Sequence, residues 1–295
     1  TEYKSSALLP PLTPVSGTPI TGELQNTLFL QTQFGTGDGI GLRVKTNPDH
    51  LGPVDWYYAN SSNPGTPSKL KVDGYSAATE GRSTYINATN QVNSDIYTNM
   101  FILSYSQEAN AATKNIFNQL YSNWILNTNI TSVDRKAMLA RDTRRWEDIV
   151  SMRSALSSYA AVNDGNYPPL GSGSYLAGTS VSVWDSWNNN LGPTLGITMP
   201  TDPINQHVSC PAGHDSLTCW NPTNTQYTCP LNSHVYRYTN LVGDYSLSVN
   251  FEFEPKTNSV YIWRGNTVAE DLAVSISSLC DQINFTAVGS GVDNN

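Results

Sequence analysis

The chain has 295 residues, of which 38% are hydrophobic and only 14% are charged, and its formal net charge is −8. This length suits two ordinary domains, and the hydrophobic fraction can fill their cores, which argues against wholesale disorder. The chain has no long block of Lys and Arg, which argues against nucleic acid or an anionic membrane as a partner. Asn, Ser and Thr must supply the polar surface, and such neutral surfaces are commoner on exported proteins, so we predict an extracellular location at the cell surface.

No window approaches 18 consecutive apolar residues, so we expect no membrane span in this chain. Its first residues, Thr1–Tyr3, lack Met, a basic region and an apolar core, so we expect no signal peptide within the given residues. Such a start is expected where a leader has been removed, and a shortened sequence would look the same.

Residues 1–22 form the first predicted segment. Their four prolines exclude a helix or a central strand, which leaves an extended arm. We expect this arm to lie on its own domain or on a neighbouring subunit through five apolar side chains, namely Leu8, Leu9, Leu12, Val15 and Ile20.

Residues 23–131 are predicted to form a β-rich domain closed by a helix. Segments 26–35 and 39–48 alternate apolar and polar residues around a glycine-rich turn, which indicates a β-hairpin. Three more strands are expected at 68–75, 82–90 and 94–106. Helical spacing over 107–127 then places one apolar face on a predicted helix, comprising Ile116, Phe117, Leu120, Trp124 and Ile125.

Residues 132–295 open with a long amphipathic helix that we place between Ser132 and the break at Asn163–Gly165 and Pro168–Pro169. Its apolar stripe is the predicted core of a helical spine: Leu139, Trp146, Ile149, Leu156 and Tyr159. Its charges are of mixed sign, with Asp142 three residues before Arg145 and Arg144 three before Glu147.

A loop region is expected over 170–200, followed by strands near 234–240, 244–254 and 259–265. The second and third of these strands read as a half-exposed antiparallel hairpin with Glu252 and Glu254 on its solvent side. The predicted fold class is therefore α+β, with a long helix packed on an antiparallel sheet in the second domain.

Four cysteines are present, Cys210, Cys219, Cys229 and Cys280, and the first three lie within twenty residues. Two disulfides would use all four, with three alternative pairings. Zinc is the rival interpretation, because three histidines surround the same segment: His207, His214 and His234. No Cys-x-x-Cys occurs and the spacings match no zinc ribbon or finger, so we predict disulfides and no metal.

The second half of the chain resembles the headpiece of type IV pilins and type II secretion pseudopilins. The matching residues are Arg141–Asp142, Arg144–Arg145, Asp148–Ile149, Ala155–Leu156, Tyr159, Asn163, Gly165, Tyr167–Pro168 and Pro200–Pro203. The resemblance implies a four-stranded antiparallel sheet carried by the helix. Residues 81–130 resemble uncharacterised exported proteins of candidate-phyla-radiation bacteria, which implies a cell-surface location and supplies no activity.

The chain departs from pilins where they assemble, because Ser5 stands where a pilin has a glutamate and Pro10 follows where its apolar helix would run. We therefore expect assembly to use the arm instead. Some pseudopilins bind calcium beside their Asp-Pro segment, and Asp202 matches it. Asp185 is the only second carboxylate we could suggest, so a structural aspartate in a turn is the preferred interpretation.

No catalytic set is recognisable, so we predict no enzyme activity and no cofactor. Residues 35–41 fail the phosphate-loop pattern, no Gly-x-Ser-x-Gly occurs, and Glu252 with Glu254 reads as solvated edge charge. The sequence thus predicts a self-assembling subunit of an extracellular filament or surface layer, a homo-oligomer or polymer whose arm contacts neighbours. The alternative is an adhesin or glycan-binding module, in which Trp184 and Trp187 stack on sugar unless they are buried loop anchors.

Overall fold

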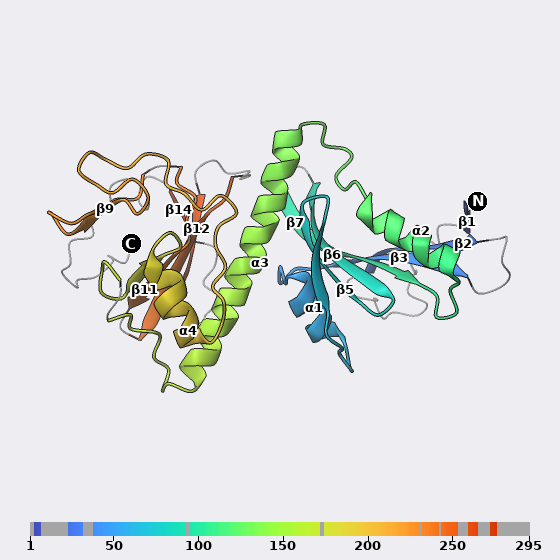
Figure 1. Cartoon of the computed structure of the whole chain (residues 1–295), viewed down its shortest axis with the longest axis horizontal. Coiled ribbons are helices and arrows are strands. Elements are labelled where there is room, and N and C mark those ends of the chain that lie inside the picture. The colour runs from blue at the N-terminus through green and yellow to red at the C-terminus, as the bar shows by residue number, and fades with distance from the viewer. Residues whose placement is uncertain are drawn as a thin grey trace. The chain divides into compact units, whose positions relative to one another are not determined.

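The structure is a computed structural model that describes residues 3–6, 23–31, 38–92, 95–171, 174–230, 232–241, 243–252, 259–264 and 272–275. The chain divides into two compact units, residues 1–147 and 148–295, and this division falls inside helix α3 (Val133–Ala161). The predicted boundary at 131/132 lies before that helix instead. Each unit contains an antiparallel sheet and helical residues, so the α+β class is confirmed (Figure 1).

The first unit is built on a seven-stranded sheet with the order β1-β2-β3-β7-β6-β5-β4 (Figure 1). Its strands are β1 (Tyr3–Ser6), β2 (Glu23–Gln31), β3 (Gly39–Thr46), β4 (Ser68–Val72), β5 (Tyr75–Glu80), β6 (Ser83–Val92) and β7 (Asp95–Tyr105). The hairpin predicted over 26–48 is confirmed, because β2 and β3 pair antiparallel with Leu30 opposite Gly39.

The single strand predicted at 68–75 is wrong, because the chain reverses within it. Asp73 and Gly74 both have positive φ, at 48° and 84°, and join β4 to β5 by a two-residue turn. Asp-Gly is a preferred sequence for such a turn. Strand β5 was missed because its small residues, including Ala77 and Ala78, give no strong alternation.

Two helices complete the described part of the first unit before α3. Helix α1 (Pro53–Asn60) lies where we predicted no regular element, and Pro53 at its first turn favours helix initiation. Helix α2 (Ala111–Ser122) is shorter than predicted, since Asn110 caps it by accepting the N–H of Thr113 at 3.0 Å. Only Phe117 of its predicted apolar face is buried, whereas Leu120 and Ile125 are exposed.

Helix α3 begins and ends where local signals predict. The Ser132 hydroxyl accepts the N–H of Arg135 at 3.3 Å, and Gly165, at φ +79°, donates its N–H to the carbonyl of Ala160 at 2.9 Å. Among the predicted spine residues, Leu139, Ile149 and Leu156 are buried. The other two, Trp146 and Tyr159, are half-buried.

The part of α3 that belongs to the first unit buries charge. Arg145 and Asp142 are 0% and 2% exposed, and the guanidinium lies 2.6 Å from the carboxylate. Glu147 accepts a hydrogen bond from the Asn87 amide at 2.8 Å, and Asn87 in turn accepts one from Asn47 at 3.0 Å. The sequence predicted the spacing of this ion pair but gave no sign of its burial.

The second unit is built on a five-stranded sheet with the order β14-β13-β12-β11-β8, where the pilin resemblance implies four strands. These strands are β8 (Thr179–Val181), β11 (Arg237–Leu241), β12 (Asp244–Asn250), β13 (Ser259–Arg264) and β14 (Leu272–Ser275), and β9 (Trp220–Asn221) pairs with β10 (Gln226–Tyr227) separately. The hairpin predicted from 244 to 265 is confirmed by the antiparallel pairing of β12 with β13.

The loop predicted over 170–200 contains short regular elements. Strand β8 joins the main sheet, and a π-helical turn η1 (Trp187–Leu191) runs into α4 (Gly192–Leu195). Elements of three to five residues are too short to show a hydrophobic period, so sequence patterning could not find them.

In the second unit, α3 lies against tyrosines of the sheet. The Tyr236 hydroxyl donates to Asp148 at 3.0 Å, and Tyr245 is hydrogen-bonded to Arg153. The helix buries its apolar side chains in this region, namely Ile149, Met152, Leu156 and Ala160.

The β12–β13 hairpin is not half-exposed as predicted. Ser248 and Asn250, on the expected solvent side of β12, are buried. The segment around Ser233 and His234 covers them, since the Asn250 amide donates to the Ser233 carbonyl at 3.2 Å and His234 donates to the Asn250 carbonyl. Farther along, Glu252 is partly buried and residue 254 lies outside the described residues.

Across the described ranges, no helix combines the length and apolar content needed to cross a bilayer.

Candidate binding site beside the disulfide loop

One predicted disulfide is present, between Cys210 and Cys219, whose Cα atoms are 5.1 Å apart. The bond closes a loop over 211–218 that we call the disulfide loop. Cys229 is buried in the same hydrophobic cluster, beside Tyr227 and Trp184. The fourth candidate, Cys280, lies outside the described residues.

The disulfide loop is held internally by Asp215. Its carboxylate accepts the N–H groups of Thr218 at 2.8 Å and Leu217 at 3.0 Å, and also the Thr218 hydroxyl at 2.8 Å. Because these bonds stabilise the ionised form, with the Thr218 N–H the largest contributor, the pKa of Asp215 is lowered.

Two side chains from outside the disulfide loop fix it to the rest of the second unit. The Trp184 indole N–H donates to the Thr218 carbonyl at 3.0 Å, and His207 Nδ1 donates to the Leu217 carbonyl at 2.9 Å. The disulfide and these hydrogen bonds therefore hold the backbone of residues 216–218 in place.

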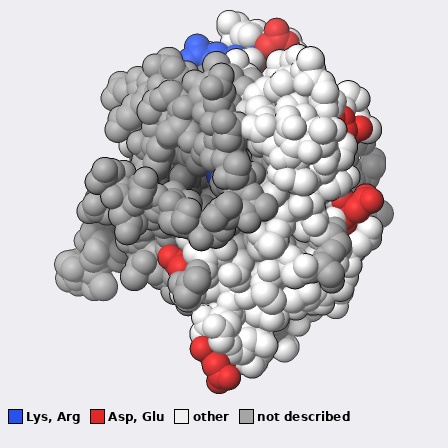
Figure 2. Space-filling model, turned by 90° about the vertical axis from the view of Figure 1, so that its left-hand side faces the viewer, with Lys and Arg blue, Asp and Glu red and all other residues white. Residues whose placement is uncertain are grey.

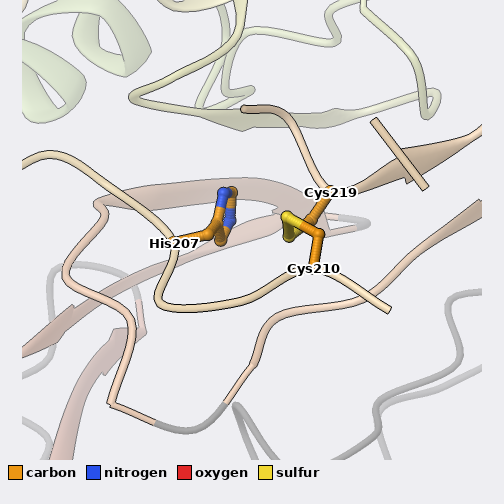
Figure 3. Close-up of side chains that lie close together, drawn as sticks. All are labelled: His207, Cys210 and Cys219. Atoms are coloured by element: carbon orange, nitrogen blue, oxygen red, sulfur yellow. A yellow bond between two sulfur atoms is a disulfide. The ribbon is translucent and has the colours of Figure 1, made fainter. Parts of the chain in front are cut away.

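His207 lies beside the disulfide, and its nearest ring nitrogen and the two sulfur atoms all lie within 4.8 Å of one another (Figure 3). This arrangement is not a metal site, because a disulfide offers no thiolate and both ring nitrogens are engaged. Nε2 accepts the Tyr227 hydroxyl at 3.0 Å while Nδ1 donates to Leu217. Burial lowers the pKa of His207, so the ring is neutral near pH 7.

The two tryptophans proposed as sugar platforms are buried anchors. Trp184 and Trp187 are 2% and 0% exposed, and the Trp187 indole N–H donates to the Pro200 carbonyl at 2.7 Å. Neither ring has a face open to a ligand, so the version of the adhesin hypothesis that uses them is wrong. The accessible aromatic in this region is Tyr175, 46% exposed and stacked on Trp220 with ring centroids 5.3 Å apart. Sequence reasoning missed this pair, because Tyr175 sits in a short Gly/Ser-rich stretch with no period.

A cleft of about 650 Å³ opens next to the disulfide loop. We call it the amide cleft, and its lining residues are Ser182, Val183, Trp184, Asp185, Asn188, Asn189, Asn205, Gln206, His207, Ser216 and Leu217. Carboxamides and hydroxyls dominate this set, Asp185 is its only carboxylate, and it contains no Lys or Arg. On the face drawn in Figure 2, the described surface is mostly uncharged, with scattered acidic groups and a basic group at the upper edge.

Asp202 caps a turn that supports one wall of the amide cleft. It is buried, and its Oδ1 accepts the N–H of Ile204 at 2.8 Å and of Asn205 at 3.4 Å. Asp185 is exposed. Within the described ranges, the only group of three His, Cys, Asp or Glu side chains close enough to share a metal ion is the His207 set, so the structural interpretation of Asp202 fits and calcium gains no support.

The predicted assembly arm is described only at Tyr3–Ser6, and its five apolar candidates, Leu8, Leu9, Leu12, Val15 and Ile20, lie outside the described residues. Tyr3–Ser6 forms β1, the edge strand of the first unit's sheet, and pairs antiparallel with Leu28–Gln31 of β2. The sheet ends at β4 on its other side, where Lys69 and Lys71 are exposed.

No protein-family model, curated protein or solved structure compared with the chain matches it. The function proposed below therefore rests on the residues of this chain alone.

Proposed function

We propose that the protein is a non-enzymatic structural subunit at the cell surface, which assembles with further copies of itself by exchanging strand β1. The observation that carries the proposal is the position of β1 at the edge of a seven-stranded sheet, where it pairs with β2 alone among the described strands. Sixteen residues, 7–22, connect the two strands.

The two edges of this sheet differ in a way that favours exchange at β1. Exposed lysines on an edge strand oppose pairing with another chain, and β4 has Lys69 and Lys71 there. Strand β1 is only four residues long, and its main-chain bonds to β2 are available equally to β2 of a neighbouring copy. Strand exchange therefore replaces the β1–β2 main-chain hydrogen bonds within one chain by the same hydrogen bonds between two chains.

The connection has the length and composition that exchange needs. Sixteen extended residues span up to roughly 50 Å, enough to reach an adjacent subunit of this size. Its four prolines, Pro10, Pro11, Pro14 and Pro19, favour extended conformations and reduce the entropy lost when the arm is held straight.

Two further observations support a cell-surface setting. The Cys210–Cys219 disulfide and the 14% of charged residues suit an exported protein. In the second unit a long helix lies against an antiparallel sheet, which is the arrangement that the resemblance to pilin headpieces implies. We propose that this unit is a pilin-like module of the subunit.

Cysteine cross-linking tests the exchange directly. Lys4 lies opposite Leu30, so Lys4→Cys with Leu30→Cys places two thiols across the β1–β2 pair. If β1 is exchanged, oxidation of concentrated protein will link chains into a ladder of dimers and longer species on a non-reducing gel. The matched control is Lys69→Cys with Ala78→Cys across β4 and β5, where the two-residue turn confines the bond to one chain.

Deletion of residues 1–20 gives the second test. The shortened protein should remain folded, because both units keep their helices and central strands. Electron microscopy of the full chain should show polymers, and the shortened protein should form none. Cross-links only within single chains, or normal polymers from the deletion variant, would refute strand exchange.

A further inference from the structure

We infer that the amide cleft of the second unit binds a neutral, polyhydroxylated ligand of the carbohydrate class. This site is separate from strand β1 and does not depend on the assembly proposed above. Its residues come from four segments of the second unit, around 182–185, 188–189, 205–207 and 216–217.

The functional groups of the cleft match sugar hydroxyls. A carboxamide offers both a donor and an acceptor, so Asn188, Asn189 and Gln206 can each engage neighbouring hydroxyls in either sense. All three are exposed at the cleft. Asp185 adds an acceptor-only group, and Ser216 adds a hydroxyl.

The charge of the cleft selects against ionic ligands. Among its described lining residues there is no Lys or Arg and one exposed carboxylate, so this lining offers a phosphate or carboxylate group no cation to pair with. One carboxylate among amides is also too little charge for a stable calcium site of the usual composition. Neutral ligands with many hydroxyls are a class that such a lining can satisfy.

The cleft also offers apolar surface of the kind that sugar rings cover. Leu217 lines it and is 74% exposed, so its side chain is available for contact with a sugar ring. The Trp184 ring lines the cleft and contacts Tyr175 in a T-shaped arrangement with ring centroids 5.0 Å apart. Tyr175 is 46% exposed, so part of its ring is accessible to a ligand. A ligand longer than one sugar could extend from the amides onto this ring.

The walls of the cleft are held in place without a ligand. Ser182 donates to the Asn205 side-chain oxygen at 2.6 Å, and the Asn205 amide donates back to the Ser182 carbonyl at 3.3 Å. The disulfide and the bonds from Trp184 and His207 fix the opposite wall at 216–218. Binding therefore loses little entropy in ordering the protein, which favours affinity even in an open site.

Affinity electrophoresis of the full chain provides the test. Native gels containing neutral polysaccharides (starch, galactomannan or hydroxyethyl cellulose) should retard the protein, whereas alginate, which is anionic, should not. Tryptophan fluorescence titrated with soluble oligosaccharides of the retarding polymer then gives a dissociation constant, because Trp184 lines the cleft.

The double substitution Asn188→Ala/Asn189→Ala should weaken binding roughly tenfold or more, the effect expected when one or two ligand hydrogen bonds are lost. Gln206→Ala should weaken it in the same direction. Asn224→Ala is the matched control, because Asn224 is an exposed amide of the same unit on the β9–β10 turn, outside the cleft lining. It should bind like the unmodified protein.

Three results would overturn the inference: no retardation by any neutral polysaccharide, retardation by alginate alone, or equal binding by the cleft variants and the control. Hydrogen exchange over residues 210–230 shows whether each variant keeps the disulfide loop folded. A variant that loses this protection is replaced by Asn188→Ser, which keeps a small polar side chain, so that the comparison with Asn224→Ala still decides.

Discussion

The two halves of α3 bury different mixtures of side chains: the first half buries Leu139 beside several charged groups, and the second buries Asp148 beside aliphatic residues. In the first unit the helix buries an ion pair, Asp142 with Arg145, and a carboxylate, Glu147. In the second unit it buries aliphatic residues such as Ile149 and Leu156. The period of apolar residues in the sequence predicts where a helix runs. Which of its side chains are buried depends on the residues of the sheet that pack against each turn.

The sheets of the two units explain this difference. In the first unit Asn87 and Thr89 of β6 face the helix and bond to Glu147 and Thr143. In the second unit the sheet side chains that reach α3 are tyrosines, whose rings supply apolar contact and whose hydroxyls find polar partners such as Asp148. The first interface is therefore specified by hydrogen bonds and the second mainly by packing.

Breaking the buried ion pair should have the largest effect. Arg145→Met removes the cation that lies 2.6 Å from the buried Asp142 carboxylate and should destabilise the first unit by about 3–5 kcal/mol. Asp142→Leu combined with Arg145→Met should recover most of this loss, because both buried charges are then gone. Urea unfolding, followed by hydrogen exchange of peptides from 39–147, measures the stability of both variants. If Arg145→Met alone were as stable as the unmodified protein, the buried ion pair would not be a source of stability.

Removing an aliphatic side chain from the other half of α3 should cause the second-largest loss of stability. Leu156→Ala should cost about 3 kcal/mol, within the usual range for a buried leucine, and its effect should appear in peptides of the second unit. The control is Val162→Ala, because Val162 lies just beyond the helix and is exposed, so its change should stay within about 0.5 kcal/mol. Equal losses from both substitutions would count against packing as the source of stability.

The polar network of the first interface should respond more modestly. Asn87→Ala leaves Glu147 and Asn47 without their shared partner and should cost about 1–3 kcal/mol. Asn87 also begins an Asn-Ala-Thr sequon but is fully buried, so the folded chain should not be modified there. Asn129→Ala, at an exposed sequon, serves as the control, and thermal unfolding of the two variants compares them.

We expect the smallest effect from acid, which should lower the stability of the second unit through His207. The pKa of His207 is lowered in the folded state, chiefly by burial, so the unfolded chain binds the extra proton first as pH falls. The stability of the second unit should therefore be complete above about pH 6.5 and decline below it, whereas His207→Gln should remove this dependence. Hydrogen exchange of residues 205–230 at pH 7 and pH 5 measures it, and an identical pH response in the variant would exclude His207 as the cause.

Local signals in the sequence predicted several elements because their causes lie within a few residues. Ser132 and Gly165 mark the two ends of α3 through their own hydrogen bonds and backbone angles. The alternation of apolar and polar residues on either side of residues 35–39 predicted the β2–β3 hairpin. Composition predicted disulfides among the four cysteines but left their pairing open, and the structure joins Cys210 to Cys219. By contrast, β5, α1 and β8 are short or weakly patterned, so the sequence alone did not reveal them.

The sequence by itself determined the α+β class, the long helix, two hairpins and a disulfide, because short-range backbone preferences and hydrophobic periods specify them. Tertiary structure alone decided which side chains are accessible. It buried Trp184, Trp187 and the Asp142–Arg145 pair, and it brought Asn188, Gln206 and Leu217 to one cleft from separate segments. Burial depends on what packs against a residue from elsewhere in the chain, and no local pattern contains that information.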